Sequence, residues 1–314
     1  MASLTFKTTA APATRRRRAW WRPRASHLFL LPYAVFLLAF GVGPALYALL
    51  ISFAKFQDGT PQFFAAGFDN FRYALHDFRF AGAFANVGTF LVISVPLGVA
   101  GCIVLALLLH ARTGGFATLM RTVYFLPGAV AGPALVLLAI FLIDPRISPF
   151  SPILHALGFR DNVQVVQTSH LPVLFTLIGF FGGAGGWIAI FYGALTGISP
   201  ELLEAATVDG ANAWQSALYI KLPLIRRFVI FMAILTFAAN IQIFTEPTLI
   251  GAALSYSSTV SPTWSPNQLG YTFAFTYGQF GAAAVVSLAM IAIGMGAAFL
   301  IIYGTHFYQT DVAE

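Results

Sequence analysis

Polar side chains within one apolar stretch, residues 229–250, are the best candidates for binding chemistry in this sequence. Thr236 and Asn240 lie four residues apart, and so do Gln242 and Glu246. On a continuous helix each pair shares a face, and the second pair points about 200° away from Asn240. Polar groups are costly at membrane depth and usually face a bundle interior or a wet cavity. One face is therefore expected to line a pathway, while the other hydrogen-bonds to neighbouring helices.

Catalytic chemistry is not indicated anywhere in the chain. A phosphate-binding loop needs Gly-Lys followed by Ser or Thr, yet none of the three lysines, Lys7, Lys55 and Lys221, follows a glycine. The six histidines are scattered and form no H-E-x-x-H motif. Cys102 is the single cysteine, so neither an internal disulfide nor a cysteine metal cluster can form. The sequence predicts a non-enzymatic chain that holds no cofactor of its own.

The elements that position these residues are six long apolar runs. The 314 residues are 58% hydrophobic and only 9% charged, which leaves too few polar groups to cover a soluble domain. A membrane-spanning helix needs about 20 apolar residues. Because the runs are continuous rather than alternating, they indicate helices and not a barrel. We expect an all-α membrane protein whose domain covers residues 28–305, with spans at about 28–53, 84–109, 123–143, 171–195, 229–250 and 281–303.

The distribution of charge predicts the orientation of these spans. The formal net charge is +6, and seven of the 17 Lys and Arg residues precede residue 28. Basic residues concentrate on the cytoplasmic side of membrane proteins, so the charge favours contact with anionic lipid rather than with nucleic acid. We expect residues 1–27 to be a disordered cytoplasmic segment, residues 306–314 to be a cytoplasmic tail, and both termini to lie inside.

Residues 199–223 form the long polar segment between the fourth and fifth runs. Ser199 can cap a helix that begins at Pro200, and Glu201 favours the positive end of its dipole. Asp209-Gly210 is typical of a turn. A second helix is predicted from residue 211 to residue 220, ending near Leu222-Pro223. The segment is therefore expected to be a short helix, a bend and a second helix at the membrane surface.

An ordered set of residues in this segment resembles the cytoplasmic EAA loop of permease subunits in binding-protein-dependent ABC importers. The resemblance is strongest to the first-permease kind in the carbohydrate branch. Glycine stands six residues after the motif glutamate, and Leu-Pro follows twelve residues later. The matching residues are Glu204, Ala205, Ala206, Asp209, Gly210, Ala211, Trp214, Ile220, Leu222 and Pro223. Two weaker elements agree, namely Gly67-Phe-Asp-Asn70-Phe71 after the first run and Arg121 to Pro127 at the start of the third.

The resemblance implies a six-helix permease bundle in a bacterial cell (inner) membrane. By that resemblance the helix around Glu204 docks on an ATPase subunit, and ATP and Mg are bound on that partner. The implied assembly holds a second homologous permease subunit, two ATPase subunits and an extracellular substrate-binding protein. The implied cargo is a sugar or a related polyhydroxy solute, and counting on from the loop puts Thr236 and Asn240 where solute-contacting residues sit.

The fourth run is rich in glycine and allows two interpretations. Gly179 with Gly183, and Gly182 with Gly186, are small-xxx-small pairs that let helices approach closely in lipid. Alternatively, the missing side chains at Gly182 and Gly183 leave a cavity beside a substrate path. The two interpretations are compatible.

Three other hypotheses remain open from the sequence. An ion-coupled secondary transporter would carry an inverted repeat, and no convincing repeat is present. A non-transporting membrane scaffold would need no polar face at Thr236 and Asn240. The 199–223 segment could also be a solvated connector between spans.

Overall fold

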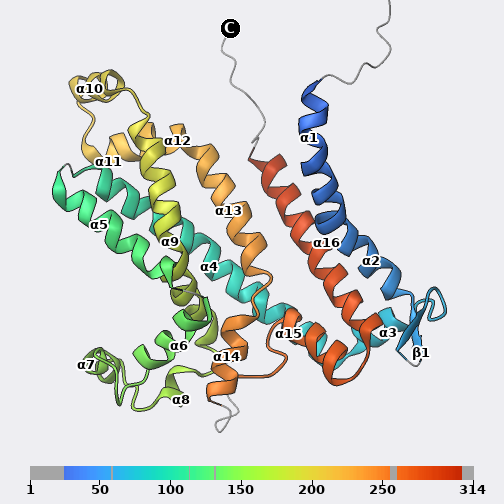
Figure 1. The fold of residues 1–314 in the computed structure, drawn as a ribbon. Coiled ribbons are helices and arrows are strands. Elements are labelled where there is room, and N and C mark those ends of the chain that lie inside the picture. Colours follow the sequence, from blue (N-terminus) through green and yellow to red (C-terminus); the bar gives the residue numbers. More distant parts are fainter. Residues whose placement is uncertain (1–24, 58, 113, 131, 255–259, 306–314) are drawn as a thin grey trace, which may run out of the picture. The chain divides into compact units, whose positions relative to one another are not determined.

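The computed structural model describes residues 25–57, 59–112, 114–130, 132–254 and 260–305 (Figure 1). Most of the predicted basic N-terminal segment, and the whole predicted tail 306–314, lie outside the described residues. The chain divides into two compact units between Tyr47 and Ala48.

The first unit is one apolar helical rod. It contains α1 (Ala25–Phe36), the π-helical segment η1 (Leu37–Val42) and the start of α2 (Gly43–Ser52). Pro44 lacks an N–H and its ring crowds the carbonyl four residues earlier, so the helix widens here and Gly43 N–H bonds to Leu38 O instead. Large side chains such as Phe29 and Phe40 are exposed in this unit, as expected for a helix surrounded by lipid.

In the described part of the second unit the regular elements are helices and one two-stranded antiparallel hairpin, β1 (Lys55–Gln57) with β2 (Thr60–Gln62). Its longest helices are α4 (Phe78–His110), α9 (Leu171–Thr196) and α16 (Phe280–Gly304). The remaining elements are α3 (Asp69–His76), α5 (Gly115–Phe125), η2 (Leu126–Ala129), α6 (Gly132–Leu142), α7 (Ser151–Ala156), α8 (Asn162–Val165), α10 (Pro200–Val208), α11 (Ala213–Ser216), η3 (Ala217–Lys221), α12 (Leu222–Leu224), α13 (Arg226–Asn240), α14 (Thr245–Ala253), α15 (Pro266–Tyr271) and η5 (Thr272–Thr276).

The predicted all-α membrane fold is confirmed. Four helical stretches of the described chain are long and apolar enough to cross a membrane, at Phe29–Ser52, Phe78–His110, Leu171–Thr196 and Phe280–Gly304. Two bent pairs raise the number to six if each pair counts as one span. The third predicted span is the first pair, Thr118–Ala129 with Gly132–Leu142, bent by 103°. Pro127 and Pro133 lie on either side of the break. Pro127 cannot donate a hydrogen bond to the carbonyl of Val123, and Pro133 fits the first turn of α6, where no intrahelical N–H bond is needed.

The fifth predicted span differs from the expected continuous helix. α13 ends at Asn240, four residues follow without helical structure, and α14 begins at Thr245. Pro247 cannot donate to the carbonyl of Ile243 and its ring crowds that group, which explains the break. The prediction that Gln242 and Glu246 share one helix face is therefore wrong, since they belong to different segments. Thr236 and Asn240 do lie together on α13.

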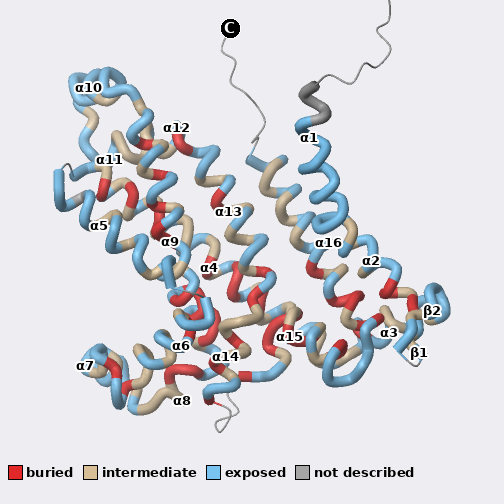
Figure 2. The backbone as a smooth tube through the Cα atoms, in the orientation of Figure 1, coloured by how far each residue is buried: buried red, intermediate tan, exposed pale blue. Residues whose placement is uncertain are grey.

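The second unit buries its apolar side chains in three clusters, and the buried stretches run along α4 and α9 (Figure 2). The Trp264 cluster joins the first halves of α4 and α9 to α6, α14 and the segment before α15. The Phe191 cluster joins the second halves of α4 and α9 to Ile225 and Met232. A third cluster packs α3 and the start of α4 against α15, η5 and α16.

Asn70 shows what the Gly67-to-Phe71 element does structurally. Its side-chain Nδ2 donates to the carbonyl oxygens of Ser52 and Ala54, at 3.0 and 2.9 Å, and so anchors α3 to the end of α2. A β-carbon at Gly281 would overlap the Asn70 side chain. Glycine at the start of α16 therefore leaves room for this anchor, which holds three helices together.

Candidate functional site: a surface loop and a bundle pocket

The loop that carries the Glu204 motif has well-formed ends. Ser199 Oγ accepts from Leu202 N–H at 3.3 Å, which caps the start of α10 as predicted. At the other end Gly210 has φ +86°, its N–H bonds to Thr207 O, and Ala211 N–H bonds to Ala206 O. This is a Schellman ending, which requires a left-handed residue and so favours glycine. The turn after α10 is therefore stabilised by backbone hydrogen bonds at Gly210 and Ala211.

The second helix of the loop starts later and continues further than predicted. Asn212 and Gln215 cap each other in a capping box, and α11 begins at Ala213. The helical run then passes through η3 to Leu224, past Pro223. Pro223 lacks an N–H, which is consistent with the wider π-helical turn before it. After Ile225 the chain bends by 70° into α13.

The second half of this loop contacts the bundle. Lys221 Nζ lies 3.3 Å from His110 Nδ1, at the last residue of α4. Ile225 is fully buried in the Phe191 cluster beside α9. Movement of the loop would therefore displace the parts of α4, α9 and α13 that it contacts.

α10 itself presents an uncovered surface. None of its residues is buried, and Val208 and Leu202 are 87% and 45% exposed. Glu204, Ala205, Asp209 and Gly210 are exposed, while Ala206 and Ala211 are half-buried. In Figure 1 the helix projects at one end of the second unit, beyond α9 and α11. An acidic and apolar helix surface of this kind can enter a groove on another protein.

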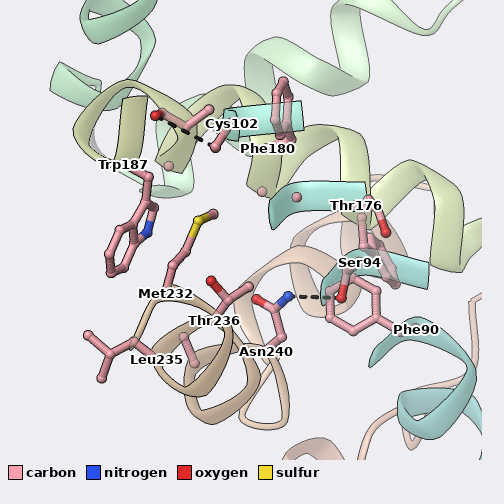
Figure 3. Close-up of a pocket in the computed structure, with 16 residues that line it drawn as sticks. Phe90, Ser94, Cys102, Thr176, Phe180, Trp187, Met232, Leu235, Thr236 and Asn240 are labelled. Atoms are coloured by element: carbon pink, nitrogen blue, oxygen red, sulfur yellow. Dashed lines mark hydrogen bonds between the residues drawn. The ribbon is translucent and has the colours of Figure 1, made fainter. Parts of the chain in front are cut away.

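A pocket of about 370 Å³ lies between α4, α9 and α13 (Figure 3). It contains three of the four residues predicted to lie on a substrate path, namely Thr236, Asn240 and Gly183. The rest of its lining consists of small, apolar, aromatic or hydroxyl side chains: Phe90, Ser94, Gly98, Cys102, Phe175, Thr176, Gly179, Phe180, Ala184, Trp187, Met232, Leu235 and Ala239. Contact of Thr236, Asn240 and Gly183 with a solute stays a prediction.

Hydrogen bonding in the pocket leaves some polar capacity unused. Asn240 Nδ2 donates to Ser94 Oγ at 2.9 Å, which links α13 to α4 (Figure 3). Thr176 Oγ1 donates to Pro172 O within α9. The Asn240 amide oxygen and the Thr236 hydroxyl have no hydrogen-bond partner among the described residues. The lining carries aromatic rings but no acidic or basic side chain, so it suits an uncharged polar molecule.

The glycine-rich span packs closely at Gly182 and Gly185, whereas Gly179, Gly183 and Gly186, the other members of the two predicted pairs, have open space at the β-carbon position. A β-carbon on Gly185 would overlap the backbone of Tyr124 and Phe125, and one on Gly182 would lie 2.5 Å from a Leu135 methyl group. These two glycines allow close packing, so Gly182 faces α6 and not the pocket. Gly183 has no neighbour within 4 Å of the β-carbon position and lies on the pocket wall.

Sequence reasoning missed Ser94, Trp187 and Phe180. Ser94 carries the same signal as Thr236, since it is a hydroxyl in a long apolar run, and it could have been identified. Nothing distinguishes Trp187 or Phe180 from lipid-facing aromatic residues until the helices are packed. Within the described ranges, no group of three His, Cys, Asp or Glu side chains could hold a metal ion.

Comparison with known proteins identifies the family. No protein-family model matches the chain. A probable ABC transporter permease protein of Brucella abortus is 30% identical over 224 residues, covering 70% of this chain and 71% of the relative. The chain belongs to the ABC transporter permeases. This permease is also 26% identical over 277 residues to the multiple sugar-binding transport system permease protein of Streptococcus mutans, covering 84% and 89% of the two chains.

A solved structure shares the fold of this permease. The bacterial alginate ABC transporter, crystallised in complex with an alginate pentasaccharide-bound periplasmic protein, contains a chain that matches with a TM-score of 0.70 and 18% identity. The match covers 90% of this permease and 93% of that chain. Its membership of the ABC transporter permeases, together with its long apolar helices, makes the chain a multi-pass membrane protein and a non-catalytic transport subunit. Family membership decides against the secondary transporter and the scaffold.

Proposed function

We propose that this permease moves an uncharged sugar or related polyhydroxy solute through the pocket lined by Thr236 and Asn240. The observation that carries the proposal is the pocket itself, with free hydroxyl and amide oxygens beside aromatic rings and no charged side chain. Hydroxyl-rich solutes offer donors to such oxygens and an apolar ring face to Trp187 or Phe180. The sugar-binding system of the Streptococcus mutans relative supports the same class of cargo.

The proposed assembly is an importer. An extracellular binding protein delivers the solute, a second homologous permease completes the pathway, and two ATPase subunits hold ATP and Mg. The periplasmic protein bound to the alginate transporter supports the first of these partners. We place both termini and α10 in the cytoplasm of a bacterial cell, because basic residues concentrate before residue 28.

The proposed mechanism couples α10 to the pocket. One of the two ATPase subunits binds the exposed surface that includes Glu204 and Val208, and it displaces α10 when the two subunits close on ATP. The Lys221–His110 contact and the buried Ile225 pass this displacement to α4 and α13. These helices form two walls of the pocket, which then opens to one side of the membrane at a time. The ATPase provides the free-energy difference between the two states.

Replacement of Asn240 by alanine in the reconstituted transporter tests the pathway. Loss of one neutral hydrogen bond costs about 0.5–1.5 kcal/mol, so the KM for ATP-driven uptake should rise about two- to tenfold. The probes are a panel of neutral mono- to tetrasaccharides and the corresponding sugar acids, and the neutral series should be preferred.

Gln242→Ala is the matched control. Gln242 has the same chemistry two residues along the chain, but it is exposed and lies outside the pocket. Its replacement should leave the KM unchanged. If Gln242→Ala raised the KM while Asn240→Ala did not, the pathway would run past Gln242, beyond the end of α13, and not through this pocket.

A further inference from the structure

Three aromatic rings are stacked at the end of the pocket that lies away from α10. Phe90 and Phe175 line the pocket and pack edge-to-face, with ring centroids 6.3 Å apart and planes at 87°. Behind them, Trp264 packs edge-to-face on Phe175 at 4.9 Å and 82°. Along α4 the pocket residues run from Phe90 towards His110, which contacts the loop. The aromatic stack therefore lies at the opposite end of the pocket.

Trp264 is held in the stack by its backbone. Asn86 Nδ2, on α4, donates to the carbonyl oxygen of Trp264 at 3.1 Å. The next residue, Ser265, forms a capping box with Gln268 at the start of α15. Trp264 thus lies at the end of the segment between α14 and α15, directly before the capped start of α15. One side-chain hydrogen bond from α4 fixes its position relative to the pocket.

The indole N–H of Trp264 is an unusual feature of this arrangement. Trp264 is only 1% exposed, yet its Nε1 has no hydrogen-bond partner among the described residues. More than nine in ten buried polar groups are paired, and an unpaired donor makes the buried position less favourable. A residue that served only to fill the core would more simply be phenylalanine. If the Trp264 side chain had a second position in which its N–H reached water, the N–H would be hydrogen-bonded there. The unpaired N–H therefore fits a side chain that moves between two positions.

We infer that the aromatic stack of Phe90, Phe175 and Trp264 is the gate that closes the pocket on the side opposite α10, and that the Asn86–Trp264 hydrogen bond keeps it closed. This inference rests on the proposed function, because a gate has meaning only for a pocket that opens to two sides. In the conformation described here the gate is closed. When α4 moves, the hydrogen bond breaks and Trp264 leaves Phe175, which opens the outer end of the pocket.

The single native cysteine provides a probe of this gate. Cys102 lines the pocket and is 1% exposed. We would label the assembled transporter with a membrane-impermeant methanethiosulfonate reagent in right-side-out and inside-out vesicles, and quantify the modified Cys102 peptide by mass spectrometry. Trp264→Ala and Asn86→Leu should each speed labelling about tenfold from the side opposite α10. A tenfold change corresponds to about 1.4 kcal/mol lost from the closed state.

Two further variants separate gating from general loosening. Trp264→Phe keeps an aromatic ring against Phe175 while it removes the unpaired N–H and the second ring of the indole, so labelling should stay slower than in Trp264→Ala. Phe191→Ala removes an equally buried ring from the cluster at the other end of the pocket, and should not speed labelling from the side opposite α10. Asn86→Leu leaves Trp264 intact, which keeps the test valid if Trp264→Ala does not fold.

Unchanged labelling in Asn86→Leu, or faster labelling only from the α10 side, would overturn the gate. Labelling does not depend on knowing the solute. If the wild-type transporter moved no sugar but the variants opened Cys102 as described, the proposed cargo would be wrong and the gate would stand. If uptake were normal and labelling were unchanged, the gate alone would fail.

Discussion

The side chain of Asn240 has groups for two purposes. Its amide nitrogen binds Ser94 and ties α13 to α4, while its amide oxygen remains available at the pocket. Interhelical hydrogen bonding and solute contact were alternatives at the level of sequence. The geometry allows both, because an amide carries separate donor and acceptor groups.

Asp77 is the side chain outside the spans whose ionisation should affect stability. Hydrogen bonds from the Arg79 guanidinium, at 2.7 and 2.8 Å, hold the pKa of the Asp77 carboxyl below its usual range. A lowered pKa in the folded state stabilises the protein at pH values above the ordinary carboxyl pKa. That contribution is lost as the pH falls through the lowered folded-state pKa. Acidification should therefore weaken the junction between α3 and α4.

Asp77→Asn should lower the free energy of unfolding by about 1–2 kcal/mol at neutral pH. Asparagine can still accept the Arg79 N–H that caps α4, so the loss reports the ion pair rather than the cap. Thermal unfolding of the purified transporter should be followed from pH 7 to pH 3. The unfolding temperatures of the wild type and Asp77→Asn should converge at the lowest pH values. Parallel curves would mean that another group causes the acid sensitivity.

At the scale of elements, the ending of α10 is the most sensitive feature of the loop. Gly210 has a left-handed backbone that costs most other residues about 1–2 kcal/mol. We therefore expect Gly210→Ala to reduce ATP-driven uptake several-fold while the ATPase activity persists, because the loop no longer holds α10 in place. Parallel assays of uptake and phosphate release measure this uncoupling.

Two substitutions serve as controls for this prediction. Gly210→Asn should retain more uptake than alanine, since asparagine tolerates the left-handed conformation. Gly193→Ala changes a glycine inside α9 whose β-carbon would meet no neighbour within 4 Å, and it should behave as wild type. Equal uptake in Gly210→Ala and Gly193→Ala would show that the turn is not needed for coupling.

At the scale of the whole molecule, the two ends of the second unit should face opposite sides of the membrane. α10 exposes Val208, and the segment between α6 and α7 exposes Arg146. In a background with Cys102 replaced by serine, a cysteine at position 208 should react only from the cytoplasmic side and a cysteine at position 146 only from outside. Labelling of both positions from one side would contradict the proposed topology.

The sequence by itself determined the helical membrane class, the approximate positions of four long apolar helices and the cap of α10 at Ser199. Apolar content determines the membrane helices. The start of α10 depends on Pro200, which lacks an N–H, and on Ser199, whose side chain bonds to a nearby backbone N–H. All of these are local properties of the chain. The break after Asn240 was missed, although Pro247 could have signalled it, because apolar content alone does not distinguish one helix from two.

Only the tertiary structure decided which side chains meet. It placed Gly183 on the pocket wall and Gly182 against Leu135, although the two are adjacent in the chain. It also brought Ser94 to Asn240 and buried Trp264 behind Phe175. Such contacts depend on how the helices pack in space. The two residues of each contact lie about 90 to 180 positions apart in the chain. No local pattern encodes them.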